Sequence, residues 1–552
     1  MKDGRVLGVA ALLVGSTTYA SIVPYTRVHI ATGDAVFGRP TSPVSYVAWN
    51  SIGSDGSIGA NLDISSPARA GIFLINQRVA VPLAVTQEQA PGADPNQVFS
   101  SLNNGLAMVV HDSEWTAFRG LLIGPGTTDA NRTGIWATGT NGLELRMRGA
   151  ASVPEAGSGV TFGAIGALSR AEPGVVVNST KLVKATGGNP EDSAIWRMTK
   201  AGRSMLVRTG DPAPGVAGAV FQSLYEDGDY AITRTGLSAG LDGRIVLTSR
   251  VKINQSIVSG IWSWTDADGL QNVAVNGQTG FLGLDSRITL DQHSAVSVGS
   301  GKFAAFRTFL QAHSSTGLVT DEDDTAIVRV DFASEASPIL RILAREGDPI
   351  PDRDVPWRIA VYRYSGIDNS HFYNPSVNSH GETAFVAHLD IPGYVSGGSA
   401  VFLSDSTGLH TLMMSGDIIP DRPGRRKWNG AGSDAIINES GDVAFLGSIN
   451  NMPGLAGLFC YQNDFGFRTI AIRGDTIEVT PGVFKTISEF QGSNGGVAFT
   501  PPTWGPNRRL YYWVAFSDFS TALVSTAIPS PSSVMPIVAI AAIGGSRRRC
   551  TA

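Results

Sequence analysis

A short phrase built around Gly-Asp recurs along the whole chain, and this repetition limits the possible folds more than any other feature. Its clearest copies are Ala31-Thr32-Gly33-Asp34, Arg208-Thr209-Gly210-Asp211, Arg345-Glu346-Gly347-Asp348, Met414-Ser415-Gly416-Asp417 and Ile472-Arg473-Gly474-Asp475. Weaker copies near Glu88, Arg148 and Asn276 fill the gaps, so the period is roughly 60 to 70 residues. A repeat of this length predicts an array of similar units rather than several unrelated domains.

Each unit between two phrases contains four apolar stretches of strand length, joined by turns rich in Gly, Asn and Asp. The third stretch is the most regular, because it opens with a small residue and two apolar ones. Its copies are Gly71-Ile72-Phe73, Gly134-Ile135-Trp136, Ala194-Ile195-Trp196, Gly260-Ile261-Trp262, Ala326-Ile327-Val328, Ala400-Val401-Phe402 and Gly457-Leu458-Phe459. Four short strands predict an antiparallel meander, and we expect the small residue to let a neighbouring unit's backbone approach.

Such a sheet buries its faces only by packing against neighbouring sheets, which a ring of four-stranded blades achieves. The first phrase is preceded by one strand, 26–30, with no earlier strands to complete its unit. The last unit has a candidate fourth strand at 522–525 but no phrase after it. We therefore predict an all-β fold, a single β-propeller of about eight four-stranded antiparallel blades, with the N-terminal strand closing the last blade. Seven blades with one irregular unit is the alternative.

Composition agrees with a strand-rich chain and excludes several function classes. The 552 residues include 65 Gly and 29 Pro, and only 16% are charged, which fits many turns between short strands. A net charge of −5 offers no basic surface for nucleic acid. The two cysteines cannot form a disulfide framework, and no Cys/His spacing matches a zinc site.

Both ends of the chain contain targeting patterns. Residues 1–20 combine Lys2 and Arg5, a short apolar run and small residues before Ser21, which predicts a signal peptide. Residues 21–527 form the repeat domain, and residues 528–552 form a separate tail. That tail contains Pro529 and Pro531, an apolar run over 534–543 and a basic cluster at Arg547, Arg548 and Arg549. A buried strand or helix of the last repeat is the alternative interpretation of the apolar run.

This three-part tail resembles the PEP-CTERM sorting tails of bacterial proteins, although Ser530 stands where that family has a glutamate. The resemblance implies an exosortase-like membrane enzyme as partner, and contact with the membrane only through the tail before processing. The repeats resemble an uncharacterised family of bacterial surface proteins with such tails, for which a β-propeller is expected. The family supplies no catalytic residues to carry over. We therefore expect an exported protein, at the cell surface or extracellular, which the tail can anchor.

The phrase carboxylates are the first candidates for a ligand-binding site. In a ring, equivalent turns lie on one rim, so Asp34, Asp211, Asp348, Asp417 and Asp475 can surround a shared axis and hold a cationic ligand or calcium. The alternative is structural: Gly supplies a positive φ angle and Asp caps the backbone N–H groups that follow it, with Ala150 and Gln278 interrupting the carboxylate ring. We expect no other cofactor or metal. The aromatic segment around His371 and Tyr373, in the longest interval between phrases, is a second candidate, as a binding loop. The alternative is that Trp357, Tyr362, Tyr364 and Tyr373 pack the blade.

Three functions fit these observations, and no nucleophile elbow, P-loop or dinucleotide fingerprint accompanies them. The first is an exported binding or scaffold module that takes a surface polysaccharide or an envelope protein. The second is a secreted hydrolase or lyase that acts on a polysaccharide through carboxylates at the centre of the ring, and the third is a structural spacer. Two inward carboxylates beside an Arg or His would favour the enzyme. A centre lined by Gly, Ser and aliphatic residues would favour binding or structure.

Overall fold

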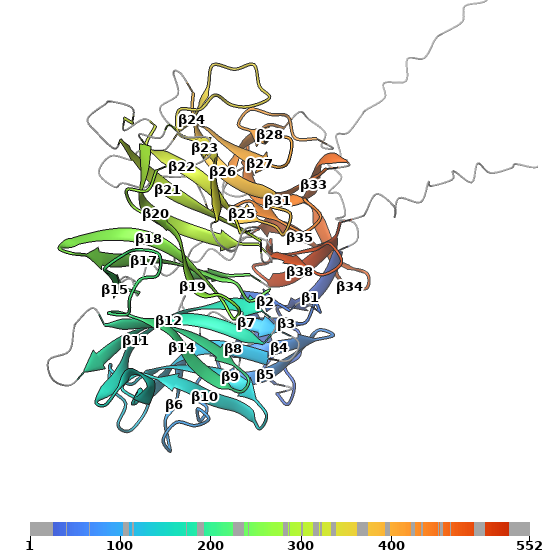
Figure 1. Cartoon of the computed structure of the whole chain (residues 1–552). Helices are drawn as coiled ribbons and strands as arrows, with labels where there is room; N and C mark the ends of the chain where they lie inside the picture. The colour runs from blue at the N-terminus through green and yellow to red at the C-terminus, as the bar shows by residue number, and fades with distance from the viewer. Residues whose placement is uncertain are drawn as a thin grey trace, which may run out of the picture.

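The computed structural model describes residues 26–528 apart from internal stretches, the longest of which are 103–109, 185–191, 225–236, 280–284, 313–318, 333–337, 361–373, 392–397, 421–425 and 491–502. The described residues form strands β1 to β38 and one short 3-10 helix, η1 (Pro154–Ala156). The strands assemble into eight small antiparallel sheets that follow one another around a ring (Figure 1). The predicted all-β fold with eight blades is confirmed.

Blades 1 to 4 use the first half of the chain. Their strands are, in blade 1, β2 (Val44–Ile52), β3 (Ile58–Ile64), β4 (Arg69–Asn76) and β5 (Val79–Val85); in blade 2, β6 (Val98–Ser101), β7 (Val110–Asp112), β8 (Trp115–Ile123), β9 (Thr133–Gly139) and β10 (Gly142–Arg148); in blade 3, β11 (Val160–Glu172), β12 (Val175–Lys184), β13 (Ser193–Thr199) and β14 (Gly202–Arg208); in blade 4, β15 (Ala219–Ser223), β16 (Leu237–Ala239), β17 (Ile245–Ile253), β18 (Ser256–Thr265) and β19 (Gly269–Val275).

Blades 5 to 8 use the second half together with the first strand. Their strands are, in blade 5, β20 (Ile288–Val298), β21 (Phe303–Ala312), β22 (Thr325–Asp331) and β23 (Ile339–Arg345); in blade 6, β24 (Arg358–Ala360), β25 (Ser376–Val377), β26 (Thr383–Asp390), β27 (Gly398–Ser404) and β28 (Leu409–Met414); in blade 7, β29 (Trp428–Ala431), β30 (Ile436–Ile437), β31 (Val443–Ile449), β32 (Gly457–Gln462) and β33 (Gly466–Ile472); in blade 8, β34 (Thr476–Thr480), β35 (Val483–Glu489), β36 (Thr503–Gly505), β37 (Arg509–Phe516), β38 (Thr521–Ala527) and β1 (Thr26–Ala31).

The first strand of each unit pairs with the second, the second with the third and the third with the fourth, as the meander requires. In blades 2, 4, 6, 7 and 8 the first strand comes in two pieces that both pair with the second strand. The inner pieces β7, β16, β25, β30 and β36, together with β2, β11 and β20, form a ring of innermost strands in the order β2, β7, β11, β16, β20, β25, β30 and β36. Each contacts the next, and β36 contacts β2. These strands therefore surround the centre of the molecule.

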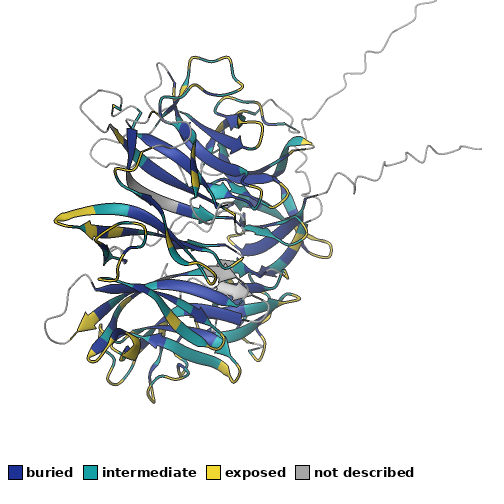
Figure 2. Cartoon of the chain, in the orientation of Figure 1, coloured by how far each residue is buried: buried dark blue, intermediate teal, exposed yellow. Residues whose placement is uncertain are grey.

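The hydrophobic core consists of eight clusters, one between each pair of adjacent blades. The third strand supplies two of them at once because successive side chains point to opposite faces. In β9, Ile135 packs in the cluster shared with blade 3, whereas Trp136 packs in the cluster shared with blade 1. Figure 2 shows that buried residues lie mainly along the strands and exposed residues mainly at the hairpin tips.

The small residue that opens the third strand has a different role from the one predicted. A Cβ at Gly134 would lie 2.6 Å from the ring of Trp136, and a Cβ at Gly457 would lie 2.6 Å from the ring of Phe459. The aromatic ring thus folds back over the glycine two positions earlier on the same face of its own strand. The glycine makes room for this ring, rather than for the backbone of the next blade.

The N-terminal strand closes the ring, as predicted. β1 pairs antiparallel with β38, with Thr26 opposite Thr526 and Ala31 opposite Ala522, so the darkest blue and red strands lie side by side in Figure 1. One detail differs from the prediction: β38 is the third strand of blade 8, not the fourth. Its residues Ala522-Leu523-Val524 follow the small-apolar-apolar pattern of the other third strands, and β1 occupies the fourth position.

Candidate functional site

The Gly-Asp phrase forms the same turn at the end of the fourth strand in five copies. Its glycines have φ angles between +83° and +97°, a conformation that side chains disfavour. The carboxylate after each glycine accepts the backbone N–H of the residue three positions earlier. The prediction that it caps the N–H groups that follow it is therefore wrong. These bonds are Asp34 to Ala31 (2.8 Å), Asp211 to Arg208 (2.8 Å), Asp348 to Arg345 (2.7 Å), Asp417 to Met414 (3.0 Å) and Asp475 to Ile472 (2.8 Å).

The residue before the glycine ties the turn to the third strand. In four copies this residue is Thr or Ser, and its hydroxyl accepts a backbone N–H at or next to the start of that strand. The pairs are Thr32 with Thr521 (3.0 Å), Thr86 with Ala70 (3.1 Å), Thr209 with Ser193 (3.1 Å) and Ser415 with Ser399 (3.0 Å). The phrase therefore fixes the last two strands of a blade to each other.

The arginine that opens the phrase binds the hairpin between the second and third strands. Arg208 Nε donates to Asp192 Oδ1 at 3.0 Å, and Arg345 donates to Asp323 Oδ2 at 2.7 Å. In blade 2, Arg148 Nε donates to the Asn131 carbonyl at 3.0 Å. These contacts place the phrases and these hairpins on the same face of the ring.

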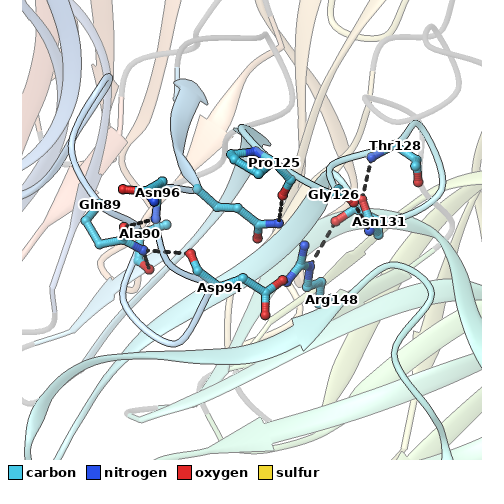
Figure 3. Close-up of polar contacts among 10 residues, drawn as sticks. Gln89, Ala90, Asp94, Asn96, Pro125, Gly126, Thr128, Asn131 and Arg148 are labelled. Atoms are coloured by element: carbon cyan, nitrogen blue, oxygen red, sulfur yellow. Dashed lines mark hydrogen bonds and ion pairs between the residues drawn. The ribbon is translucent and has the colours of Figure 1, made fainter.

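Figure 3 shows this arrangement in blade 2. Arg148 also pairs with Asp94 at 3.1 Å. Asp94 lies in the segment that follows the preceding phrase copy, near Glu88. Asn131 holds the hairpin together, since its amide accepts the Thr128 N–H at 2.7 Å and donates to the Gly126 carbonyl at 3.0 Å. These bonds join the phrase, the hairpin and the segment of Asp94, so the cluster stabilises the rim of the blade.

The structure corrects the alignment of two weaker phrase copies. Ala150, with a φ angle of +60°, occupies the glycine position, so Ala151 and not Ala150 stands where the other copies have Asp. In the copy before it, Glu88 occupies that position, after Gln87 with a φ angle of +66°. Gln278 does occupy the Asp position, and its Oε1 accepts the Val275 N–H at 3.2 Å. A neutral acceptor thus serves in the same turn.

The five candidate carboxylates are bound within their own turns and, in two copies, to an arginine as well. Asp34 pairs with Arg78, and Asp417 pairs with Arg353 at 2.9 Å. Asp475 is 3% exposed, and burial raises the pKa of Asp348. No group of three or more His, Cys, Asp and Glu side chains that can hold a metal ion occurs within the described residues. Ligand or calcium binding by these carboxylates stays a prediction.

Other predicted site residues lie outside the described residues. His371 and Tyr373 belong to 361–373, and the tail residues Pro529, Pro531, Arg547, Arg548 and Arg549 follow residue 528. Within the described part of the chain, no helix is long and apolar enough to cross a membrane.

The first described residue after the candidate binding loop belongs to a polar cluster formed by three blades. Asn374, in blade 6, donates to the carboxylate of Asp434, in blade 7, through its backbone N–H and its side-chain Nδ2, both at 3.0 Å. Burial raises the pKa of Asp434, while these bonds and the charge of Arg307, a buried residue of β21 in blade 5, oppose the rise. We call Arg307, Asn374 and Asp434 the three-blade cluster. It lies beside the innermost strands β25 and β30.

The inner pieces of blades 4, 6, 7 and 8 and the last two residues of β20 in blade 5 are small, hydroxylated or apolar. They are Leu237-Ser238-Ala239, Ser297-Val298, Ser376-Val377, Ile436-Ile437 and Thr503-Trp504-Gly505. This is the lining that the sequence analysis associates with binding or structure. The three-blade cluster adds one carboxylate, one amide and one guanidinium close to it.

Two carboxylates influence a tyrosine on the innermost strand of blade 1. Burial, together with the charges of Asp63 in β3 and Glu489 in β35, raises the pKa of Tyr46 in β2. Two carboxylates from blades 1 and 8 thus act on one phenol.

Sequence reasoning missed the residues of the three-blade cluster. Each is a lone polar residue in a different unit, and no local spacing relates residue 307 to residue 434. A second network was detectable, because the turn Asn-x-x-Gly followed by an acid occurs at both Asn378 and Asn438. In the structure Asn378 Nδ2 donates to the Asn438 carbonyl at 3.0 Å, which links blades 6 and 7.

Eight blades closed by the N-terminal strand, with a small polar cluster beside the innermost strands, define the molecule as a β-propeller with a candidate central binding site. The chain belongs to the DUF7453 family, a family of unknown function, whose model matches residues 30–279 and again residues 254–535. Each match spans about half of the ring. No curated protein matches the chain.

Several solved β-structures are similar to the chain over most of its length. An oligogalacturonate lyase in complex with manganese matches with 10% identity and a TM-score of 0.34, covering 80% of this chain and 99% of that one. The β-propeller domain of the Trilobed protease from Pyrococcus furiosus matches with 10% identity and a TM-score of 0.33, covering 78% and 96%. The polysaccharide lyase Uly1 matches with 10% identity and a TM-score of 0.34, covering 80% and 94%. At these scores the similarities say nothing about activity.

Proposed function

We propose that this protein is an exported β-propeller that acts as a binding and scaffold module at the cell surface or in the extracellular matrix. Its partner is a surface polysaccharide or an envelope protein, which binds at the centre of the ring. The observation that carries this proposal is the series of Ser, Thr and small apolar residues on the innermost strands β16, β25 and β36, such as Ser238-Ala239 and Ser376-Val377. Hydroxyl groups hydrogen-bond to sugar hydroxyls, and small side chains let a polymer approach closely.

The three-blade cluster gives this surface its polar anchor. Asp434 is held by two hydrogen bonds from Asn374, so its carboxylate has a fixed position. A fixed acceptor beside a buried guanidinium binds a hydroxylated ligand with little loss of side-chain entropy. Asn374 also directly follows the predicted binding loop with His371 and Tyr373, which supports a role for that loop in the same site.

Affinity electrophoresis of the full chain tests this proposal. The protein migrates through gels that contain a neutral polysaccharide, an acidic polysaccharide or an envelope extract, and retardation measures binding. We expect retardation by at least one of these, and a loss of affinity of tenfold or more in Asp434→Ala. Asp266→Ala is the matched control, because that carboxylate is 76% exposed at a hairpin tip. Equal affinity of both variants, or no retardation in any gel, would contradict the proposal.

A polysaccharide hydrolase or lyase is the second candidate, and the observation that favours it is Tyr46 with Asp63 and Glu489 acting on it. This candidate predicts that a retarding polysaccharide is also shortened during incubation. Size-exclusion chromatography of the polymer measures the shortening, and Asp63→Asn should abolish it. Binding without shortening would reject this candidate and leave the binding module in place.

The tail supports a proposal about localisation. β1 and β38 run antiparallel with Thr26 opposite Thr526, so the start of the first strand lies next to the end of the last strand. We propose that residues 1–20 are removed on export and that an exosortase-like enzyme processes residues 528–552. Intact-mass measurement of the native protein tests both steps. Retention of residues 1–20 and of Arg547, Arg548 and Arg549 would reject them.

A further inference from the structure

The strand that closes the ring carries a partly buried histidine in direct contact with its neighbour. His29 in β1 has its Nε2 atom 2.8 Å from Ser525 Oγ in β38, and its ring lies 5.1 Å from the ring of Tyr511 in β37. This contact joins residues that are almost 500 positions apart in the sequence, so it belongs to the closure itself. We call His29, Ser525 and Arg509 the closure contact.

The hydrogen bonds of this contact fix the protonation state of the histidine. Arg509 Nε is a permanent donor and donates to Ser525 Oγ at 3.1 Å. Ser525 is fully buried, so its hydroxyl hydrogen needs a partner inside the protein. Within the described residues, His29 Nε2 is the acceptor in reach of that hydroxyl. His29 is therefore neutral in this arrangement, with its own hydrogen on Nδ1.

The charges around His29 also oppose its protonation. Burial and the positive charges of Arg27 in β1 and Arg509 in β37 lower the pKa of His29 to about 4. β38 carries no ionisable side chain. A proton on His29 would therefore add a third positive charge to this position.

The other elements packed against β1 do not offset these charges at His29. In β34, Glu478 is exposed and accepts the Gly482 N–H within its own hairpin. Burial and the charge of Asp55 in blade 1 raise the pKa of Tyr511, and burial and the charges of Asp63 in blade 1 and Glu489 in blade 8 raise the pKa of Tyr46. Arg69 of blade 1 pairs with Glu88.

We propose that the closure contact is an acid-sensitive latch: protonation of His29 breaks its bond to Ser525 and releases β1 from β38, so that the ring opens at this position. The protonated Nε2–H points at a hydroxyl that already accepts from Arg509. One of the two donors must then move away, or the buried hydroxyl hydrogen loses its partner. Release of β1 exposes the edge of β38 to solvent.

Hydrogen exchange of the full chain at pH 7.0 and pH 3.5 tests the latch. We expect protection factors of the β1 amides to fall at least tenfold more than those of β14, which is also a fourth strand but is held within a continuous segment of chain. In His29→Gln, which cannot gain a charge, this excess loss should shrink to less than twofold. Parallel losses in β1 and β14, or an unchanged excess in His29→Gln, would overturn the proposal.

A measurement on the unmodified protein remains decisive if that variant fails to fold. Nitrogen NMR of His29 at pH 7 should show the tautomer with hydrogen on Nδ1, and the Nε2 resonance should titrate together with the loss of protection in β1. A hydrogen on Nε2 at pH 7 would overturn the latch. Titration of His29 with β1 still fully protected would overturn it too.

Discussion

The guanidinium of Arg508 donates two hydrogen bonds to the buried carboxylate of Asp442, one of them 2.8 Å from Nε to Oδ2. This pair joins blades 7 and 8. Asp442 is 1% exposed, and its own turn adds two bonds with the Asn438 side chain, whose Nδ2 donates to Asp442 Oδ2 and whose Oδ1 accepts the Asp442 backbone N–H. The pair sits at the interface beside the closing blade.

Removing one member of this pair should destabilise the fold strongly. Asp442→Ala leaves the Arg508 guanidinium without its carboxylate, and we expect a loss of about 3–5 kcal/mol in the free energy of unfolding. Chemical denaturation measures the loss. The control is Asp129→Ala, which removes the exposed pair of Asp129 with Arg132 and should cost less than about 1 kcal/mol. Similar losses in both variants would mean that the buried pair contributes no more than a surface pair.

The buried aromatic residue of the third strand should contribute more to the free energy of unfolding than an exposed aromatic residue does. Trp136 is fully buried between blades 1 and 2, so Trp136→Ala should reduce the free energy of unfolding by about 3–5 kcal/mol. Phe519, which is 95% exposed, serves as the control, and its alanine variant should change stability by less than about 0.5 kcal/mol. Thermal denaturation compares the two. A small effect of the Trp136 variant would contradict the description of the inter-blade core.

The phrase carboxylates can be tested for a turn role against a ligand role. Asp211→Asn keeps an acceptor for the Arg208 N–H, as Gln278 does in blade 4, so its stability should stay within about 0.5 kcal/mol of the original. Asp211→Ala removes the acceptor and should cost about 1 kcal/mol, as loss of a helix cap does. The ligand role is tested by measuring the melting temperature of the unmodified protein with and without calcium. A calcium-dependent rise that both variants lose would show that the carboxylates bind the ion.

Lys485 should control the ionisation of Asp518. The ammonium of Lys485 lies 2.8 Å from Asp518 Oδ2, and this contact together with the Ser520 hydroxyl lowers the pKa of Asp518 to about 2. A lowered carboxyl pKa favours the folded state above the unfolded value of about 3.9, and this contribution disappears as the pH falls towards 2. In Lys485→Met the Asp518 pKa should rise towards its ordinary value, as carbon-detected NMR can measure. An unchanged pKa would mean that Ser520 alone sets it.

Most of the fold could be predicted from local sequence patterns. The phrase marks the end of each fourth strand, and the small-apolar-aromatic pattern marks each third strand, because every blade solves the same packing problem. The closing strand was predictable for the same reason, since residues 26–30 form a fourth strand without a blade. The role of the small residue was not, because its contact with Trp136 depends on a side-chain conformation that spacing does not reveal.

The candidate site was much less predictable. Arg307, Asn374 and Asp434 come together only because three consecutive blades converge on one centre, and each residue alone resembles an ordinary polar residue in a strand or turn. The phrase carboxylates attracted attention because they repeat, yet repetition reflects a turn that every blade needs. Residues that differ between copies, such as Asp434, carry the candidate function.

The register of β1 against β38 has a mechanical consequence. Thr26 and Thr526 are opposed where the chain enters and leaves the ring, so a pull on both ends loads this ladder at one end and breaks its hydrogen bonds one after another. A ladder peeled in this way yields at much lower force than one sheared along its length. The ring is therefore held firmly by its eight inter-blade cores, while tension between its two ends would open it first at the outer strand of blade 8.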